Sequence, residues 1–437
     1  MKLPSFLKNV LTLVSGTVVS QAVIVFSSPL LTRLFSPEEF GVLAVFSSLL
    51  AILAVVAAGR YEIAIPIADT KRDAISLYYI SFSIVLISSI ATVIILNLGS
   101  KSSVAWWGAD IPESFFWLLP LTLLSFGLYQ NQTYWAIRAN SFTSLSISRI
   151  AHSISIVLFQ IAGGVIGLGA PALLFGLLAG KSIGFISLVL QVKMPKLGSK
   201  EINIRSNLFR YKEYPIYTTW ASLANALGTQ AAPLVIAKLF TVVDVGFFAL
   251  AMRVLGLPST LIGQAVGQVF FPTIAEKENR GEPVGAIVEE SAIVLLKLAL
   301  PTFLIVLLVG PEIFCFIFGE QWIKAGEYAQ LLVPWLILSF VSSPLSTYVL
   351  IKKKNKLALY VTVYELILRM GALGAGGLSN SIEITVMLYS VSGAIISFIY
   401  IGWVLSLAGS SLTRFIMRIW RGCRSRYLIL CGRERGG

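Results

Sequence analysis

The chain has 437 residues, 56% of them hydrophobic and only 13% charged, and its mean hydropathy is +0.83. Its 34 basic and 21 acidic side chains are too few to cover a water-soluble globule of this length, so the surplus apolar surface must face lipid. The net charge of +13 does not indicate nucleic acid, because the basic residues lie between long apolar runs and form no basic and aromatic patches.

Apolar runs of helical length recur along the whole chain. A transmembrane helix needs about 20 apolar residues, and a helix satisfies its own backbone hydrogen bonds inside lipid. The first run is too long for a signal peptide and has no cleavage pattern, so we expect it to stay in the protein. The sequence therefore predicts an all-α, polytopic membrane protein with about 12 transmembrane helices, at residues 10–31, 40–58, 74–98, 114–131, 144–167, 170–192, 214–237, 245–271, 288–310, 328–351, 357–378 and 384–406.

The basic residues predict the orientation of these spans, because basic flanks resist translocation across a membrane. With both termini in the cytoplasm, 25 of the 34 basic residues fall in cytoplasmic segments, 4 in outer loops and 5 inside spans. An amphipathic pattern begins at Arg414 and predicts a helix that lies on the anionic inner leaflet, with a partner-binding tail as the alternative. Trp106, Trp107 and Trp322 fall in outer loops, where we expect an aromatic belt at the interface.

A short pattern occurs twice in the chain, 205 residues apart. Residues 33–44 read RLFSPEEFGVLA and residues 238–249 read KLFTVVDVGFFA, and each copy follows the first span of a six-span half. This predicts two six-helix lobes related as a parallel repeat, with domains at 1–205 and 206–406 and a basic cytoplasmic tail at 407–437. The alternative is chance convergence on a helix start, where acidic residues are favoured.

No set of residues suggests a metal, a cofactor or a disulfide framework. Cys315, Cys423 and Cys431 have no paired spacing, and His152 is the single histidine of the chain. We therefore expect no cofactor and no metal site.

The segment GLLAGKS at residues 176–182 resembles a phosphate-binding loop but is one residue too short and lies inside a span. Gly176, Gly180 and Gly184 predict instead a small-residue face for close helix packing. No catalytic motif appears in a plausible context, so we do not expect an enzyme.

Charges inside the spans are the sharpest functional signal, because each costs about 3 kcal/mol even on insertion scales and so usually faces a cavity or a partner. Arg60 closes the second span, Arg149 lies in the fifth, and Arg253 starts a polar face in the eighth that continues through Gln264 and Gln268. Cations with nearby amides suit an anionic head group that carries sugars. We predict that these side chains line a substrate cavity.

Other charged residues inside spans include two lysines and an acidic–basic pair. Lys181 and Lys297 either line the same cavity or extend toward the membrane surface. Glu365 and Arg369 are spaced i,i+4 in the favourable order, which predicts a structural ion pair, with ion coupling as the alternative role.

Four segments carry a family resemblance: PLLTRLFSPEEFGVLAVFSS (29–48), RYEIAIPIAD (60–69), FFALAMRVLGLPSTLIGQAVGQVFFPTIAE (247–276) and FGEQWIKAGEYAQLLVPW (318–335). In these segments the chain resembles the polysaccharide-transporter branch of the multidrug/oligosaccharidyl-lipid/polysaccharide exporter superfamily, which includes Wzx-type O-antigen flippases. The resemblance runs from about residue 5 to 405.

The resemblance implies a twelve-helix, two-lobe transporter of the bacterial inner membrane. Its cargo would be an undecaprenyl-diphosphate-linked oligosaccharide, moved from the inner to the outer leaflet for the synthesis of O-antigen lipopolysaccharide, capsule or exopolysaccharide. The implied partners are this lipid, the bilayer and other polysaccharide-assembly membrane proteins, without nucleic acid. It also implies a cavity lined by cations; Arg60 and Arg253 lie in matching segments, whereas Arg149 rests on the span assignment alone.

Two other functions stay open at this point. A multidrug or organic-cation antiporter of the same superfamily prefers carboxylates in its cavity, but acidic residues are scarce in the spans, Glu365 being the main one. A membrane-embedded glycan polymerase or ligase generally needs a sizeable outer loop, whereas the predicted outer loops have about six to sixteen residues.

Overall fold

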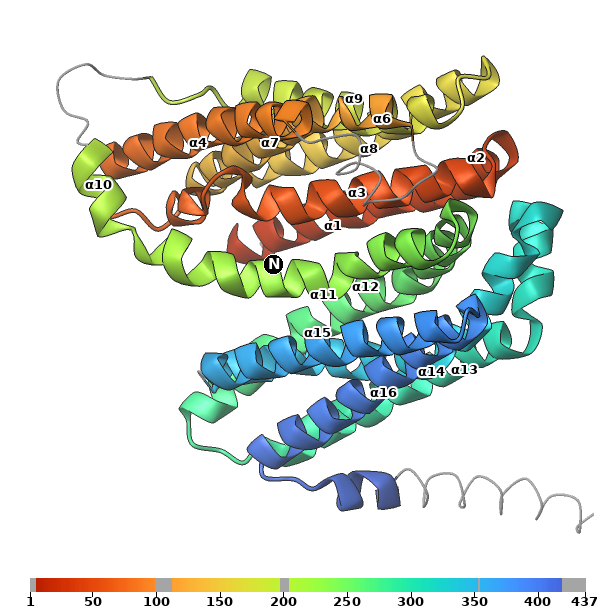
Figure 1. The fold of residues 1–437 in the computed structure, drawn as a ribbon. Coiled ribbons are helices and arrows are strands. Elements are labelled where there is room, and N and C mark those ends of the chain that lie inside the picture. The colour runs from red at the N-terminus through yellow and green to blue at the C-terminus, as the bar shows by residue number, and fades with distance from the viewer. Residues whose placement is uncertain (1–4, 99–111, 197–203, 353, 419–437) are drawn as a thin grey trace, which may run out of the picture. The chain divides into compact units, whose positions relative to one another are not determined.

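The computed structural model describes residues 5–98, 112–196, 204–352 and 354–418, and every regular element in these ranges is a helix (Figure 1). A helix also covers residues 412–418. The elements are α1 (Ser5–Phe26), α2 (Ser28–Leu34), α3 (Pro37–Ala57), η1 (Tyr61–Ala64), α4 (Lys71–Leu98), α6 (Glu113–Phe116), α7 (Leu119–Arg138), α8 (Phe142–Val165), α9 (Ala170–Gln191), α10 (Ile204–Arg210), η2 (Tyr214–Thr218), α11 (Thr219–Leu239), α12 (Val242–Asn279), α13 (Gly285–Phe318), η3 (Glu320–Trp322), α14 (Ile323–Ile351), α15 (Asn355–Leu378) and α16 (Ile382–Leu407).

Each of the twelve predicted spans overlaps a long helix, although bounds differ: the first covers parts of both α1 and α2, and the fourth (114–131) begins before α7 and ends before α7 does. Ten of the described helices are long and apolar enough to cross a membrane. The other two, α7 and α11, carry more polar side chains, such as the consecutive Gln130, Asn131 and Gln132 of α7. The protein is all-α and multi-pass, as the sequence predicts.

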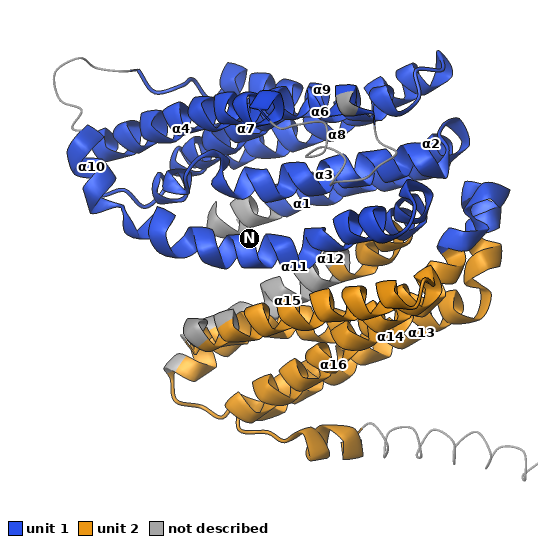
Figure 2. Cartoon of the chain, in the orientation of Figure 1, with its two compact units in different colours: residues 1–250, 314–325 blue, residues 251–313, 326–437 orange. Residues whose placement is uncertain are grey.

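The chain divides into two compact units (Figure 2). Unit 1 comprises residues 1–250 and 314–325, and unit 2 comprises residues 251–313 and 326–437. Unit 1 extends beyond residue 205 because α11 packs along α3. The division of the chain into six-span lobes at residue 205 stays a prediction.

Within unit 1, α8 and α9 pack closely through glycines, and α1 and α7 flank this pair. A Cβ atom on Gly180 would collide with the side chain of Ile156, and one on Gly184 would lie 3.1 Å from Cβ of His152. A Cβ on Gly176 would likewise collide with the side chain of Gln160. The predicted small-residue face is therefore confirmed, and it allows the two backbones to approach closely.

The repeated pattern forms the same local structure in both copies. Ser36 and Glu39 cap α3 reciprocally: the Ser36 N–H donates to Glu39 Oε2 at 2.7 Å, and the Glu39 N–H donates to Ser36 Oγ at 3.3 Å. In the second copy the Thr241 N–H donates to Asp244 Oδ2 at 3.2 Å, and the Asp244 N–H donates to Thr241 Oγ1 at 3.2 Å. These capping boxes explain why both copies place an acidic residue three positions after Ser or Thr.

The two copies also contact each other through their glycines. A Cβ on Gly41 would collide with the carbonyl oxygen of Val242, and a Cβ on Gly246 would collide with the carbonyl oxygen of Pro37. The starts of α3 and α12 therefore cross at backbone distance, and the contact is reciprocal, as it must be for two segments related by a two-fold repeat.

The prediction that Trp322 belongs to an interfacial belt is wrong. Its side chain is fully buried in unit 1, edge-on to Phe40 and Phe247, with ring centroids 5.0 and 6.0 Å away. The indole N–H donates to the carbonyl oxygen of Thr32 at 3.0 Å. Trp322 therefore holds the two repeat copies together. Trp106 and Trp107 lie outside the described residues.

In unit 2, α13 bends where Pro311 interrupts its hydrogen bonds. Val309 has non-helical dihedral angles (φ −134°, ψ 32°). Pro311 has no N–H to donate to the carbonyl of Leu307 four residues earlier, and Nε2 of Gln330 on α14 donates to that oxygen instead, at 2.9 Å. A side chain from the neighbouring helix thus satisfies the carbonyl group that the proline leaves open.

The start of the basic tail docks onto unit 2. Phe415 is buried, and the carboxylate of Glu289 on α13 accepts a hydrogen bond from Ser410 at 2.7 Å and pairs with Arg418 at 3.3 Å. Arg414 is exposed. The tail helix is therefore held by protein contacts as well as by any lipid contacts, and its continuation after residue 418 lies outside the described residues.

We predict that Gly246→Ala destabilises the protein by about 1–3 kcal/mol, because the added methyl group meets backbone that cannot move aside without shifting a helix. Gly228→Ala in α11 is the matched control, since no atom lies within 4 Å of its added Cβ; removing glycine from a helix there should stabilise slightly. Thermal unfolding in detergent measures both. Equal melting temperatures for Gly246→Ala and the wild type would contradict the crossing.

Candidate functional site

Arg60 has an unusual backbone conformation just after the end of α3. Gly59 and Arg60 both have φ of 63°, which is the left-handed region, and Arg60 leads directly into η1. This conformation costs a residue with a Cβ about 1–2 kcal/mol. The guanidinium is half-buried, and its Nε has no hydrogen-bond partner among the described residues.

The carboxylate of Glu62 lies beside Arg60 and is 1% exposed. Its Oε1 accepts a hydrogen bond from Nε2 of Gln130 on α7 at 3.0 Å, whereas its Oε2 has no partner in the described part of the chain. Burial raises the pKa of Glu62, and the charge of Arg60 and the hydrogen bond from Gln130 offset only part of this effect. Glu62 is thus a weaker acid than a solvent-exposed glutamate.

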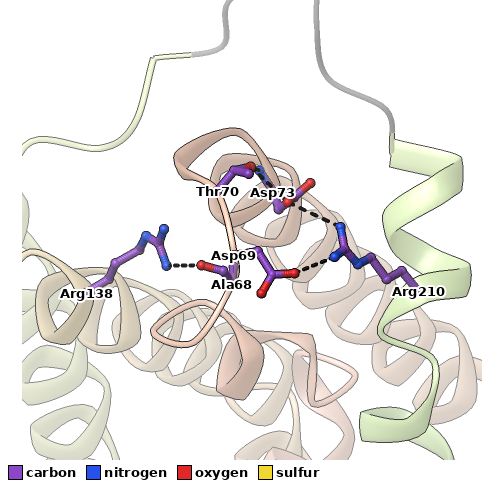
Figure 3. A network of polar contacts seen from close by, with 6 residues as sticks. All are labelled: Ala68, Asp69, Thr70, Asp73, Arg138 and Arg210. Atoms are coloured by element: carbon purple, nitrogen blue, oxygen red, sulfur yellow. Dashed lines mark hydrogen bonds and ion pairs between the residues drawn. The ribbon is translucent and has the colours of Figure 1, made fainter.

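Two arginines hold the connection between α3 and α4 in place (Figure 3). Nη1 of Arg138 donates to the carbonyl oxygens of Ile65, Pro66 and Ala68 at 3.0, 3.3 and 2.9 Å. Arg210 of α10 pairs with Asp69 and, at 3.7 Å, with Asp73. These contacts fix the segment that carries Arg60 and Glu62.

A buried polar network links α4 and α7 behind this segment. The hydroxyl of Tyr78 donates to Oε1 of Gln132 at 2.8 Å, and Nε2 of Gln132 donates to the carbonyl of Val192 at 2.6 Å. Nδ2 of Asn131 donates to the carbonyl of Tyr78 at 3.0 Å. The run of amides in α7 therefore serves helix packing at 131 and 132 and binds Glu62 at 130.

Arg149 and Lys181 lie in the same helix cluster of unit 1. Arg149 of α8 is half-buried, and its Nη1 donates to Oγ1 of Thr17 on α1 at 2.5 Å. Nζ of Lys181 on α9 lies 4.7 Å from the ring centroid of Phe126 and 5.7 Å from that of Tyr129. The aromatic faces offer the ammonium a weak electrostatic partner.

His152 completes the surroundings of Lys181. Its ring lies 5.7 Å from that of Tyr129, and its Nδ1 is buried with no hydrogen-bond partner in the described ranges. The Tyr129 hydroxyl lies 3.1 Å from Oγ of Ser148. The neighbours of Lys181 are thus aromatic or neutral polar groups.

The remaining predicted cavity residues lie in unit 2. Arg253 is half-buried in α12 and has an interaction partner. Gln264 and Gln268 lie in α12, but their side chains are outside the described part. Lys297 is exposed on α13, among exposed apolar residues such as Leu298 and Leu300. The assignment of these residues to one cavity stays a prediction.

Glu365 and Arg369 form an ion pair in α15, with Glu365 Oε1 at 2.7 Å from Arg369 Nη2. Arg369 is 3% exposed, its guanidinium lies 4.1 Å from the ring centroid of Trp335, and its Nη1 donates to the Tyr389 hydroxyl at 2.7 Å. The arginine joins α15 to α14 and α16, which is a structural arrangement. Ion coupling by this pair stays a prediction.

The charges of unit 1 are unbalanced. Arg60, Arg149 and Lys181 form no ion pair with any carboxylate among the residues that the structure describes, and each is at most half-exposed. Sequence reasoning selected the three cations but missed Gln130, Phe126 and Tyr129 as their surroundings. The amides inside the fourth span were the visible signal for Gln130. Chemically, the arrangement suits a ligand that brings negative charge.

Relatives were found at low identity. The chain is 23% identical over 273 residues to the lipopolysaccharide biosynthesis protein WzxC of Escherichia coli (strain K12), which covers 62% of this chain and 52% of WzxC. It is 25% identical over 210 residues to the probable low-salt glycan biosynthesis flippase Agl15 of Haloferax volcanii, covering 47% of this chain and 43% of Agl15. The chain therefore matches about half the length of these relatives.

Solved structures share the fold. The Lipid II flippase MurJ in an inward closed conformation matches with a TM-score of 0.76 at 13% identity, over 93% of this chain and 89% of MurJ. An inward-facing multidrug resistance MATE family transporter of the MOP superfamily matches with a TM-score of 0.69 at 12% identity, over 89% of this chain and 95% of that chain. At these identities the matches show the fold alone.

The sequence profile of one family, described as "Polysaccharide biosynthesis protein", matches residues 30–327. The folds that resemble this chain are those of transporters and flippases, and not of enzymes. Because the match covers more than half of the chain, the protein belongs to this polysaccharide biosynthesis family.

Proposed function

We propose that the protein is a flippase that moves an undecaprenyl-diphosphate-linked oligosaccharide from the inner to the outer leaflet of a bacterial cytoplasmic membrane. The proposal is supported by the membership in a polysaccharide biosynthesis family and by relatives named for lipopolysaccharide and glycan biosynthesis. The product would serve O-antigen, capsule or exopolysaccharide synthesis. Both termini would lie in the cytoplasm, where most of the basic segments are predicted.

The observation that carries the proposal is the unbalanced positive charge of unit 1. Lys181 is inside a span, faces aromatic rings, and has no carboxylate partner among the described residues. Burying a cation in such surroundings costs free energy unless a ligand supplies an anion to pair with it. A diphosphate would do so, and the cations would in turn replace the water that the diphosphate loses.

An organic-cation antiporter is the alternative within the same fold, since MATE transporters share it. Such a transporter would need a buried carboxylate that is free to attract a cation. Of the two buried carboxylates in the described residues, Glu62 already lies beside Arg60 and accepts from Gln130 through Oε1, and Glu289 accepts from Ser410 and pairs with Arg418. The charge balance therefore favours an anionic cargo.

Transport would proceed by alternating access. A state that opens to the cytoplasm admits the diphosphate and its glycan, while the polyprenyl chain stays in lipid. A conformational change then exposes the head group on the outer side, where weaker binding or consumption of the glycan releases it. Arg60, Arg149 and Lys181 would bind the diphosphate, and Arg253, Gln264 and Gln268 would contribute from α12.

Deleting the gene should cause one lipid-linked oligosaccharide to accumulate in the inner leaflet, because its synthesis continues while its export stops. Mass spectrometry of lipid extracts identifies the species, and a membrane-impermeant glycan-labelling reagent reports the leaflet. Complementation with the wild-type gene is the control. An unchanged pool of lipid-linked oligosaccharides would contradict the flippase assignment.

Replacing Lys181 by methionine should lower flipping about tenfold or more, because one charge-assisted contact to a phosphate contributes about 1.5–3 kcal/mol. Methionine keeps the length and the contact with the aromatic rings. Arg205→Met is the control, since Arg205 is an exposed cation on α10. Fluorescent-lipid transport in proteoliposomes, corrected for protein level, measures both. Full activity of Lys181→Met would remove this residue from the binding site.

The Arg60→Gly variant removes the guanidinium and keeps the left-handed backbone conformation, so it tests the charge apart from the backbone. Glycine adopts φ of 63° without strain, so the variant should melt at the same or a higher temperature than the wild type, yet flip about tenfold more slowly because a cation is missing. Asn140→Gly is the matched control: Asn140 has φ of 54° in the turn between α7 and α8, so the backbone change is the same and no charge is lost. If Arg60→Gly flips normally, Arg60 does not bind cargo.

A further inference from the structure

The described residues contain two apolar grooves of similar size, one in each unit. The first lies between α15 and α16 in unit 2 and has a volume of about 400 Å³. The second lies between α8 and α9 in unit 1 and has a volume of about 370 Å³. Both are formed by helices that qualify as membrane spans, and lining side chains such as Ile399 and Phe159 are exposed.

The α15–α16 groove exists because the two helices pack tightly at one end and carry large side chains at the other. Near their connecting turn, a Cβ on Gly376 would collide with Thr385. Toward the opposite end, Tyr360, Tyr364, Tyr400 and Trp403 line the groove. Tyr400 and Trp403 are packed edge to face with centroids 5.5 Å apart, so this wall is ordered by its own contacts.

The groove begins at a basic turn. Leu357 lines the groove and lies in the first turn of α15. Lys354, the residue just before this helix, is exposed. Lys352 is held nearby by Glu278, and the sequence of the turn is KKKNK at residues 352–356. From Leu357 to Tyr364 the groove follows α15 for about 10 Å, at 1.5 Å per residue. It therefore leads from a positive charge into the apolar surface.

The α8–α9 groove lacks these features. Its lining consists of aliphatic, glycine and phenylalanine residues, such as Phe159, Ala172 and Phe175, with no hydroxyl or indole group. The adjoining turn, residues 166–169, reads IGLG and has no charge. Size and apolarity are thus shared by both grooves, and the polar aromatic rings and the lysines are specific to the groove in unit 2.

We propose that the α15–α16 groove is a binding site for one anionic phospholipid, independent of the proposed cargo site. The acyl chain lies in the groove, the tyrosine hydroxyls and the indole N–H contact the glycerol region, and the phosphate meets Lys354. Tyrosine and tryptophan favour the interfacial depth where such groups lie. Lysines next to a membrane attract anionic lipids, and the charge of the turn therefore decides between an anionic and a zwitterionic occupant.

Native mass spectrometry of the full chain, released from nanodiscs with equal phosphatidylglycerol and phosphatidylcholine of the same chains, tests this proposal. We expect the wild type to retain one phosphatidylglycerol in preference to phosphatidylcholine. Lys354→Ala should lower that retention about fivefold. Ile399→Trp, which fills the groove at a side chain that is 58% exposed, should abolish it.

Phe159→Trp in the α8–α9 groove is the matched control, because Phe159 is 50% exposed and lines a groove of similar size without charge. It should leave phosphatidylglycerol retention unchanged. The melting temperatures of all variants show whether they fold. Equal retention of the two lipids by the wild type, or equal loss in both tryptophan variants, would overturn the proposal. So would displacement of phosphatidylglycerol by an equal amount of polyprenyl phosphate, because the groove would then hold the cargo's chain.

Discussion

Polar groups inside hydrocarbon must find their partners within the protein, because no water is available to solvate them. This constraint accounts for the helices and also for contacts that repair them. The carbonyl of Leu307, left open by Pro311, accepts a hydrogen bond from Gln330. Cations follow the same rule: Arg369 is enclosed by a carboxylate and two aromatic rings, and Lys181 lies on aromatic faces. The positive charge that these partners do not balance is available to bind a ligand.

The basic residues therefore serve three purposes that their charge alone does not distinguish. Most of them lie in segments whose charge predicts the orientation of the chain in the membrane. Some of these also build the structure, as Arg138 does by binding three carbonyl groups and Arg210 does by pairing with two aspartates. A third set, Arg60, Arg149 and Lys181, forms no ion pair with a carboxylate among the described residues. Sorting the cations by their partners, rather than by their position along the chain, is what supports an anionic cargo.

Patterns that depend on neighbours along one helix were readable from the sequence. The twelve spans, the glycine face of α9 and the capping residues of the repeated pattern all follow from local periodicity or spacing. Trp322 was misread, because its position in an outer loop suggested a membrane interface, whereas η3 turns its side chain into a core between Phe40 and Phe247. The partners of the cations were also hidden, since Gln130 lies 68 residues after Glu62 and Thr17 lies 132 residues before Arg149.

The sequence by itself determined that the chain lies in lipid, which segments form its long helices, and which charges are too costly to be incidental. These properties depend on the transfer of local segments from water to hydrocarbon, so composition and spacing suffice. Only the tertiary structure decided which cations are satisfied, that Gly41 and Gly246 let two backbones cross, and that one of two similar grooves ends at a basic turn. Those outcomes depend on residues far apart in the chain meeting at distances of a few ångströms, which no local pattern specifies.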